Sequence, residues 1–154
     1  MKIVEIPDIF KMETGAPEPT LLASGSSLTI SFYKDVGTNE NVFPCYILRF
    51  KQVRYHSFGT PNDEALNGHP YYKLGLRSYS FYMIERSDLI EKLQSINSVH
   101  PYYNASKWSN LKHYIITFKE QMFECVASEY EIEEYENSSP NEQVLKLLTD
   151  SCTK

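Results

Sequence analysis

Cysteine and long apolar runs are scarce in this 154-residue chain. Its 3 cysteines, Cys45, Cys125 and Cys152, form no CxxC pair, which argues against a disulfide framework and against a four-thiolate zinc site, so we expect reduced thiols. No apolar run is long enough to span a membrane, and the acidic residues and proline of MKIVEIPDIFKMET interrupt the apolar core that a signal peptide needs. The expected location is the cytoplasm, with no membrane partner.

Familiar catalytic and nucleotide-binding signatures are also missing. The chain has no GxSxG nucleophile elbow, no Walker A loop and no dinucleotide-binding GxGxxG sequence. Lys and Arg total 15 against 20 Asp and Glu, and the resulting net charge of -5 disfavours nonspecific nucleic-acid binding, which needs a basic patch. We therefore expect no nucleic-acid partner and no cofactor, and we assign no catalytic residue.

What the chain does have is enough apolar residues, 42%, to form a packed core. This content and the length predict a single globular domain over residues 1–154. Alternating apolar residues predict strands within residues 2–6, 27–33, 42–55, 78–85 and 112–128. Capping signals predict a helix that starts at Ser87 or Asp88 and a second that starts at Ser139 and Pro140. The expected fold class is α+β, a mainly antiparallel β-sheet with helices packed against it.

The first expected helix carries an apolar stripe of Leu89, Ile90, Leu93 and Ile96. In the second, Val144, Leu145 and Leu148 follow the capping residues. Core packing explains the stripe of the first helix, and a partner-binding groove is the alternative.

The segment 112–128 predicts a hairpin with Glu120 and Gln121 as its turn. In that register one face is apolar and the other is mixed, whereas a slip by one residue would mix them. The apolar face holds Tyr114, Ile116, Phe118, Phe123, Cys125 and Ala127. His113 then faces away from Cys125, which argues against a catalytic pair of thiolate and imidazole.

The segment HSFGTPNDEALNGHPYY, residues 56–72, has two interpretations. In the structural one, Thr60 caps a short helix, Pro61 and Asp63 follow in its first turn, and Gly68 ends it. In the functional one, imidazoles, carboxylates and phenols of the loop bind a small ligand or a metal ion. The candidate ligand-binding residues are His56, Asp63, Glu64, His69, Tyr71 and Tyr72. Their spacing matches no metal motif, so whether any metal binds stays open.

The acidic stretch EYEIEEYE, residues 129–136, also has two interpretations. As a terminal edge strand, its charges face solvent and discourage edge-to-edge aggregation. As a binding surface, its charge attracts a basic protein while its aromatic rings add contact area. The candidate partner-binding residues are Glu129, Tyr130, Glu131, Glu133, Glu134 and Tyr135.

The stretches NDEALNGHPYYKLGL, NSVHPYY and LKHYIITFKEQMFECVA resemble a family of small, uncharacterised bacterial cytoplasmic proteins. The resemblance covers roughly residues 52–130 and implies no activity and no residue roles. From size and charge, the leading hypothesis is a non-enzymatic protein-binding factor, immunity-like or antitoxin-like, that engages a basic partner through its acidic C-terminal surface. The alternatives are a small-ligand or metal-binding protein, with or without enzyme activity, that uses the loop from His56 to Tyr72, and a tyrosine-rich homo-oligomer.

Overall fold

The computed structural model describes residues 1–38 and 42–152, without the side chains of residues 151 and 152. Residues 39–41, part of the expected loop after the 27–33 strand, and the thiol of Cys152 lie outside this description. The chain divides into two compact units: unit 1 comprises Met1–Ile6 and Gln52–Glu129, and unit 2 comprises Pro7–Lys51 and Tyr130–Lys154. The expectation of a single domain stays a prediction, because the division alone does not show whether either unit folds independently.

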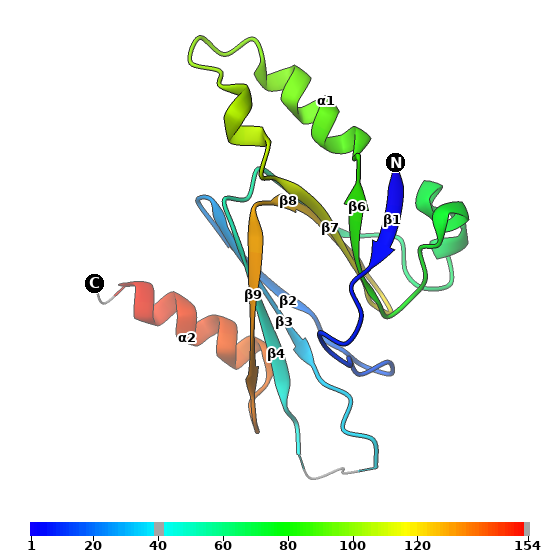
Figure 1. Ribbon diagram of the computed structural model, residues 1–154. Helices are drawn as coiled ribbons and strands as arrows, with labels where there is room; N and C mark the ends of the chain where they lie inside the picture. The colour runs from blue at the N-terminus through cyan, green and yellow to red at the C-terminus, as the bar shows by residue number, and fades with distance from the viewer. Residues whose placement is uncertain (39–41, 153–154) are drawn as a thin grey trace. The chain divides into compact units, whose positions relative to one another are not determined.

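Two antiparallel sheets dominate the described residues (Figure 1), which confirms the α+β prediction. Their strand orders are β1-β6-β7-β8-β5 and β2-β3-β4-β9. The strands are β1 (Lys2–Glu5), β2 (Thr20–Ser24), β3 (Ser27–Tyr33), β4 (Cys45–Lys51), β5 (Tyr55–Gly59), β6 (Phe81–Glu85), β7 (Lys112–Thr117), β8 (Met122–Ala127) and β9 (Glu129–Tyr135). The helices are α1 (Asp88–Asn97), α2 (Pro140–Cys152) and the short 3₁₀ segments η1 (Leu66–Gly68), η2 (Pro70–Leu74) and η3 (Ala105–Trp108).

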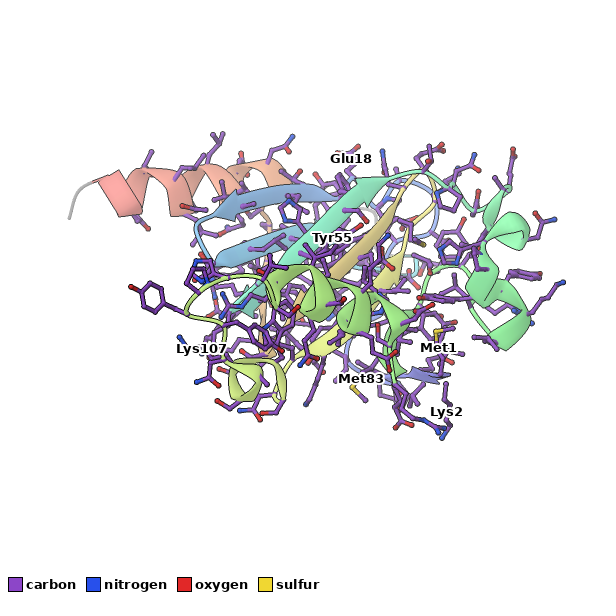
Figure 2. All side chains as sticks on the ribbon, turned by 90° about the horizontal axis from the view of Figure 1, so that it is seen from above. Met1, Lys2, Glu18, Tyr55, Met83 and Lys107 are labelled. Carbon is purple, nitrogen blue, oxygen red and sulfur yellow. The ribbon has the colours of Figure 1, made fainter. Side chains whose placement is uncertain are left out.

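Unit 1 is built on the five-stranded sheet. Figure 2 shows Lys2 and Met83 close together, as expected from the pairing of β1 with β6. On one face of the sheet, Tyr82, Ile84 and Ile115 form an apolar cluster with residues from the segment between β5 and β6, including Leu66 and Leu76. The segment proposed as a ligand loop is therefore also part of the core of unit 1.

Unit 2 is built on the four-stranded sheet, and α2 packs against β2, β3 and β4. In β3, Ile30 and the neighbouring Ser31 are both fully buried, so both faces of this strand are covered. The Ser31 hydroxyl donates to the Tyr46 carbonyl at 2.9 Å, which satisfies a polar group that burial would otherwise leave unpaired. On α2, Gln143 and Val144 are buried.

Both helix starts were predicted correctly. Ser87 caps α1, and its hydroxyl oxygen accepts from the Ile90 amide at 3.2 Å. At α2, the Ser139 hydroxyl accepts from the Glu142 amide at 3.2 Å while the Glu142 carboxylate accepts from the Ser139 amide at 3.0 Å, which completes a capping box.

The predicted apolar stripe of α1 faces inward only in part. Leu89, Ile90 and Leu93 are half-buried, whereas Ile96 is 58% exposed, and no residue of α1 is fully buried. In α2, Val144 is buried together with Pro140 and Gln143, whereas Leu145 and Leu148 are exposed. The buried positions therefore follow the helical spacing from Pro140 rather than the leucines.

Three other predictions require correction. The expected strand over residues 42–55 is two strands, β4 and β5, because Gln52 has a φ of 52° and ends the extended run. Strand β2 was missed, and Gly25, with a φ of 58°, lies in the turn that joins it to β3. The expected helix with Thr60 as N-cap is absent; the described helical turn covers only Leu66–Gly68.

The hairpin of β7 and β8 has the predicted faces but a different register. Tyr114 pairs with Cys125 and His113 pairs with Val126, which is a shift of two residues from the expected pairing. The Phe118 amide donates to the Gln121 carbonyl at 2.9 Å, so the turn consists of Lys119 and Glu120, one residue earlier than expected. A shift of two preserves every face because side chains alternate with period two.

Candidate functional site

The predicted acidic surface lies on β9, at the end of the strand order of its sheet. Three of its glutamates form ion pairs within unit 2: Glu131 with Lys51, Glu133 with Arg49 at 2.7 Å, and Glu134 with Lys34 at 2.6 Å. The glutamate side chains remain 43–55% exposed. Since each glutamate has a basic neighbour, these three positions together carry little uncompensated charge.

The aromatic residues of β9 also have contacts inside unit 2. The Tyr130 ring lies 6.0 Å from that of Phe50, and burial raises the pKa of the Tyr130 phenol. The Tyr135 hydroxyl donates to the Glu133 carboxylate at 2.6 Å. Hydrogen bonding from Arg49 lowers the pKa of Glu133. The exposed Glu129 begins the strand.

The net charge of the chain lies entirely in unit 2. The sequence within the bounds of unit 1 contains nine basic and nine acidic residues, whereas unit 2 contains six basic and eleven acidic residues. The difference in unit 2 equals the whole net charge of -5. Ion pairing within unit 2 leaves this excess unchanged, because each pair removes one charge of each sign.

A groove of about 600 Å³ follows β9 and runs along α2. Tyr135 and Glu136 line it from the end of the strand, and Glu142, Leu145 and Lys146 line it from the helix. Leu145 is 58% exposed. The groove therefore combines carboxylates with an exposed apolar side chain, all within unit 2.

The residues of the predicted ligand loop do not gather at one point. His56 lies on β5 and Glu64 follows in the next segment, and both are exposed. Asp63 accepts from the Tyr79 hydroxyl at 2.5 Å, a hydrogen bond that raises the pKa of Tyr79 to about 12. The Tyr72 ring lies 4.5 Å from the guanidinium carbon of Arg77.

His69 and Tyr71, by contrast, lie near each other and near the sheet of unit 1. The His69 Nδ1 accepts from the Tyr71 amide at 3.2 Å, so His69 caps η2. The Tyr71 ring lies 6.0 Å from the ring of His113, and its hydroxyl donates to Asp88 at 3.0 Å. Burial is the main cause that lowers the pKa of His69 and raises that of Tyr71.

A hydrogen-bonded row of Ser87, His113 and Glu124 is the chemical feature that sequence reasoning missed. The Ser87 hydroxyl lies 2.7 Å from the His113 Nδ1, and the His113 Nε2 lies 2.8 Å from the Glu124 carboxylate. An ionised carboxylate can only accept, so Nε2 carries the proton and Nδ1 accepts from Ser87. The row thus has the arrangement of a serine nucleophile, an imidazole base that accepts its proton and a carboxylate that orients the base.

The serine and the imidazole of the row are both buried. Ser87 is 3% exposed and His113 is 0% exposed. The Ser87 oxygen caps α1, while the Leu89 amide, at the helix start, donates to Asp88 at 3.0 Å. The Asp88 carboxylate therefore occupies an amide at the start of α1. In a reaction at Ser87, such an amide would stabilise the developing oxyanion. In this conformation the row joins the start of α1 to the sheet.

Cys125 is separate from this row. Consecutive positions of β8 place Cys125 and Glu124 on opposite faces of the sheet, and His113 shares the face of Glu124. Burial raises the pKa of Cys125 well above the usual value, which disfavours the thiolate. The predicted separation of Cys125 from His113 is confirmed.

Comparisons with known proteins assign no family: no family model, no curated protein and no solved structure matches the chain. The resemblance to small bacterial proteins stays a prediction. Among the described side chains, no three of His, Cys, Asp or Glu come together in a way that could hold a metal ion. No helix in residues 1–38 or 42–152 is both long and apolar enough to cross a membrane.

Proposed function

We propose that this protein is a non-enzymatic binding factor of the immunity or antitoxin kind, which engages a basic protein through the acidic C-terminal surface of unit 2. The observation that carries the proposal is the groove between the end of β9 and α2, where Glu136 and Glu142 accompany the exposed Leu145. A basic partner is attracted over a distance by the excess charge of unit 2 and gains contact energy by burying the leucine.

The groove changes which residues of the acidic surface matter most. Glu131, Glu133 and Glu134 already have basic neighbours, and an exposed ion pair contributes only about 0–1 kcal/mol, so a partner can exchange these pairs at little cost. Glu136 and Leu145 line the groove itself. We therefore assign the main contacts to the groove and the steering of the partner to the excess negative charge of unit 2 as a whole.

A pull-down from a lysate of the source organism tests the proposal, with the bound proteins identified by mass spectrometry at low and moderate salt. The parent protein should retain one basic protein, and the variant with both Glu136→Lys and Leu145→Asp should lose it. Glu120→Lys repeats the glutamate-to-lysine substitution in the β7–β8 turn, outside the groove, and should retain the partner. Equal retention by all three proteins would contradict the assignment to the groove.

A second candidate function is nucleophilic catalysis in unit 1 by the Ser87 hydroxyl with His113 as its base. Of the ligand-loop candidates, Tyr71 lies beside His113, and His69 lies beside Tyr71. One observation favours this function: Ser87 lines a cavity of about 340 Å³ together with Ile90, Leu111 and Lys112. A substrate that reached this cavity would meet a hydroxyl hydrogen-bonded to an imidazole base.

Labelling with a fluorophosphonate, which reacts with activated serine hydroxyls, tests this second function. Catalysis requires one label per chain, lost in Ser87→Ala and in His113→Asn but kept in Ser95→Ala, which changes a serine outside the cavity. An unlabelled parent protein would leave the row with its structural role alone.

A further inference from the structure

A second cavity in unit 1, separate from the proposed binding groove, has a lining of unusual composition. Its volume is about 260 Å³, and it lies between the C-terminal end of α1, η3 and the segment before β5. Three basic residues, Arg54, His100 and Lys107, line it, and Figure 2 shows Lys107 on the helical turn that follows α1. None of the described lining residues is acidic. The cavity therefore favours a negatively charged ligand.

The hydrogen bonds around this cavity use acceptors of its lining residues and leave several of their N–H donors for a ligand. The His100 Nδ1 accepts from the Tyr102 amide at 3.1 Å, so a neutral His100 carries its proton on Nε2. The Asn104 side-chain oxygen accepts from the amide and the hydroxyl of Ser106 at 2.9 and 2.7 Å, which leaves the Asn104 amide nitrogen as a donor. Arg54 and Lys107 add a guanidinium and an ammonium group. Together with His100 and Asn104, four lining side chains therefore offer N–H groups to an anion.

Three aromatic rings and Asn97 form the remainder of the lining. Tyr103 and Trp108 are half-buried, and Tyr102 is 88% exposed. The Tyr103 hydroxyl accepts from the Gln94 amide nitrogen at 2.8 Å, so its own proton is also available to an acceptor. Aromatic rings stack favourably on a planar ring, and guanidinium groups pair with carboxylates and phosphates. The cavity is smaller than the usual range of about 300–1,000 Å³ for drug-sized ligands, which points to a ligand with one ring.

We propose that this cavity binds a small aromatic anion, a planar ring that carries a carboxylate or a phosphate. Arg54, His100 and Lys107 hold the anionic group, and Trp108 and Tyr103 contact the ring. The site is independent of the partner-binding groove, since the two lie in different units.

Trp108 supplies a direct readout because it is the single tryptophan of the chain. We would titrate the whole protein with benzoate and with phenyl phosphate and follow tryptophan fluorescence. Cyclohexanecarboxylate tests the charge without the aromatic ring, and phenol tests the ring without the anion. Both should bind at least about tenfold more weakly than the aromatic anions, since each lacks one of the two recognised features. Saturation by only one of benzoate and phenyl phosphate would identify the anionic group.

Variants locate the binding. The double variant Arg54→Gln and Lys107→Gln should weaken binding by about tenfold or more, because each substitution removes a charged donor. Lys73→Gln removes a positive charge on η2, outside the cavity, and should bind like the parent. Amide chemical-shift changes in the parent protein, expected at residues 100–108, give a second location that depends on no variant.

Three results would overturn the proposal: no saturable fluorescence change with either aromatic anion, equal binding of cyclohexanecarboxylate and benzoate, or unchanged affinity in the double variant. Loss of the basic partner from the groove would leave these titrations unaffected, so the two proposals fail separately.

Discussion

Units 1 and 2 contain similar polar side chains but place them in different surroundings. In unit 2, glutamates meet lysine and arginine on a half-exposed strand, as Glu133 meets Arg49. In unit 1, Glu124 meets His113 beneath a helix, and His113 has no exposed surface. Hydrogen bonds of similar length therefore contribute differently to the free energy of unfolding. Water replaces a lost partner at the surface but cannot do so in the interior. The number of such contacts is a poor guide to their importance.

The largest expected effect tests this contrast at Glu124. Glu124→Leu should lower the free energy of unfolding by about 3 kcal/mol, because the buried His113 Nε2–H loses its acceptor. Removing both partners, with Glu124→Leu and His113→Leu together, should recover part of that loss, since two apolar groups leave no unpaired donor between them. Urea denaturation measures both values. A cost for Glu124→Leu below about 1 kcal/mol would show that water reaches the imidazole.

The two helix caps provide a smaller and better matched test. Ser87 and Ser139 each accept from an amide of the first helical turn at 3.2 Å, but only Ser87 also bonds to a buried imidazole. We expect Ser139→Ala to cost about 1 kcal/mol and Ser87→Ala roughly twice as much. Hydrogen exchange of the α1 and α2 amides would separate the two losses. Equal costs would mean that the bond to His113 adds nothing to the cap.

A third and smaller effect concerns pH in unit 1. Burial lowers the pKa of His69 below its usual value of 6.5. A histidine with a lowered folded-state pKa contributes stability that is present above pH 6.5 and is lost as the pH falls toward the folded-state pKa. His69→Asn keeps an oxygen acceptor for the Tyr71 amide but does not titrate. Between about pH 7.5 and about pH 5.5, its urea midpoint should therefore fall less than that of the parent. Identical slopes would contradict the assignment.

The smallest effect is expected on β9. Glu133→Gln should change the free energy of unfolding by less than about 1 kcal/mol, because the ion pair with Arg49 is half-exposed, and moderate salt should reduce the difference further. Arg49 lowers the pKa of Glu133, so the contribution is present above pH 4.5 and disappears as the pH falls below that value. A cost as large as that of Glu124→Leu would remove the contrast between the two units.

The elements that sequence predicted well are those whose signals are local. Capping at Ser87 and Ser139 depends on residues within one helical turn, and the faces of β7 and β8 depend on alternation that survives a shift of two residues. The break at Gln52 was missed because apolar residues continue on both sides of it while the backbone changes direction.

The candidate sites were harder to predict because they depend on contacts between distant segments. Ser87, His113 and Glu124 come from a helix start and two strands, and nothing in their spacing relates them. The pairing of β9 glutamates with residues of β4 likewise requires knowledge of the strand order. One local signal was present and was not used: His69 followed by Pro70 has the pattern of a cap and a first helical proline, and His69 indeed caps η2.

Each unit is assembled from two separate stretches of chain, and the chain passes between them after Ile6, Lys51 and Glu129. During synthesis, the N-terminal strand of unit 1 leaves the ribosome first and must wait for β6, its pairing partner, while residues of unit 2 emerge in between. Unit 1 has all its strands once Ala127 has emerged, whereas unit 2 still lacks β9 and α2. The order of translation therefore completes the strands of the neutral unit before those of the acidic one.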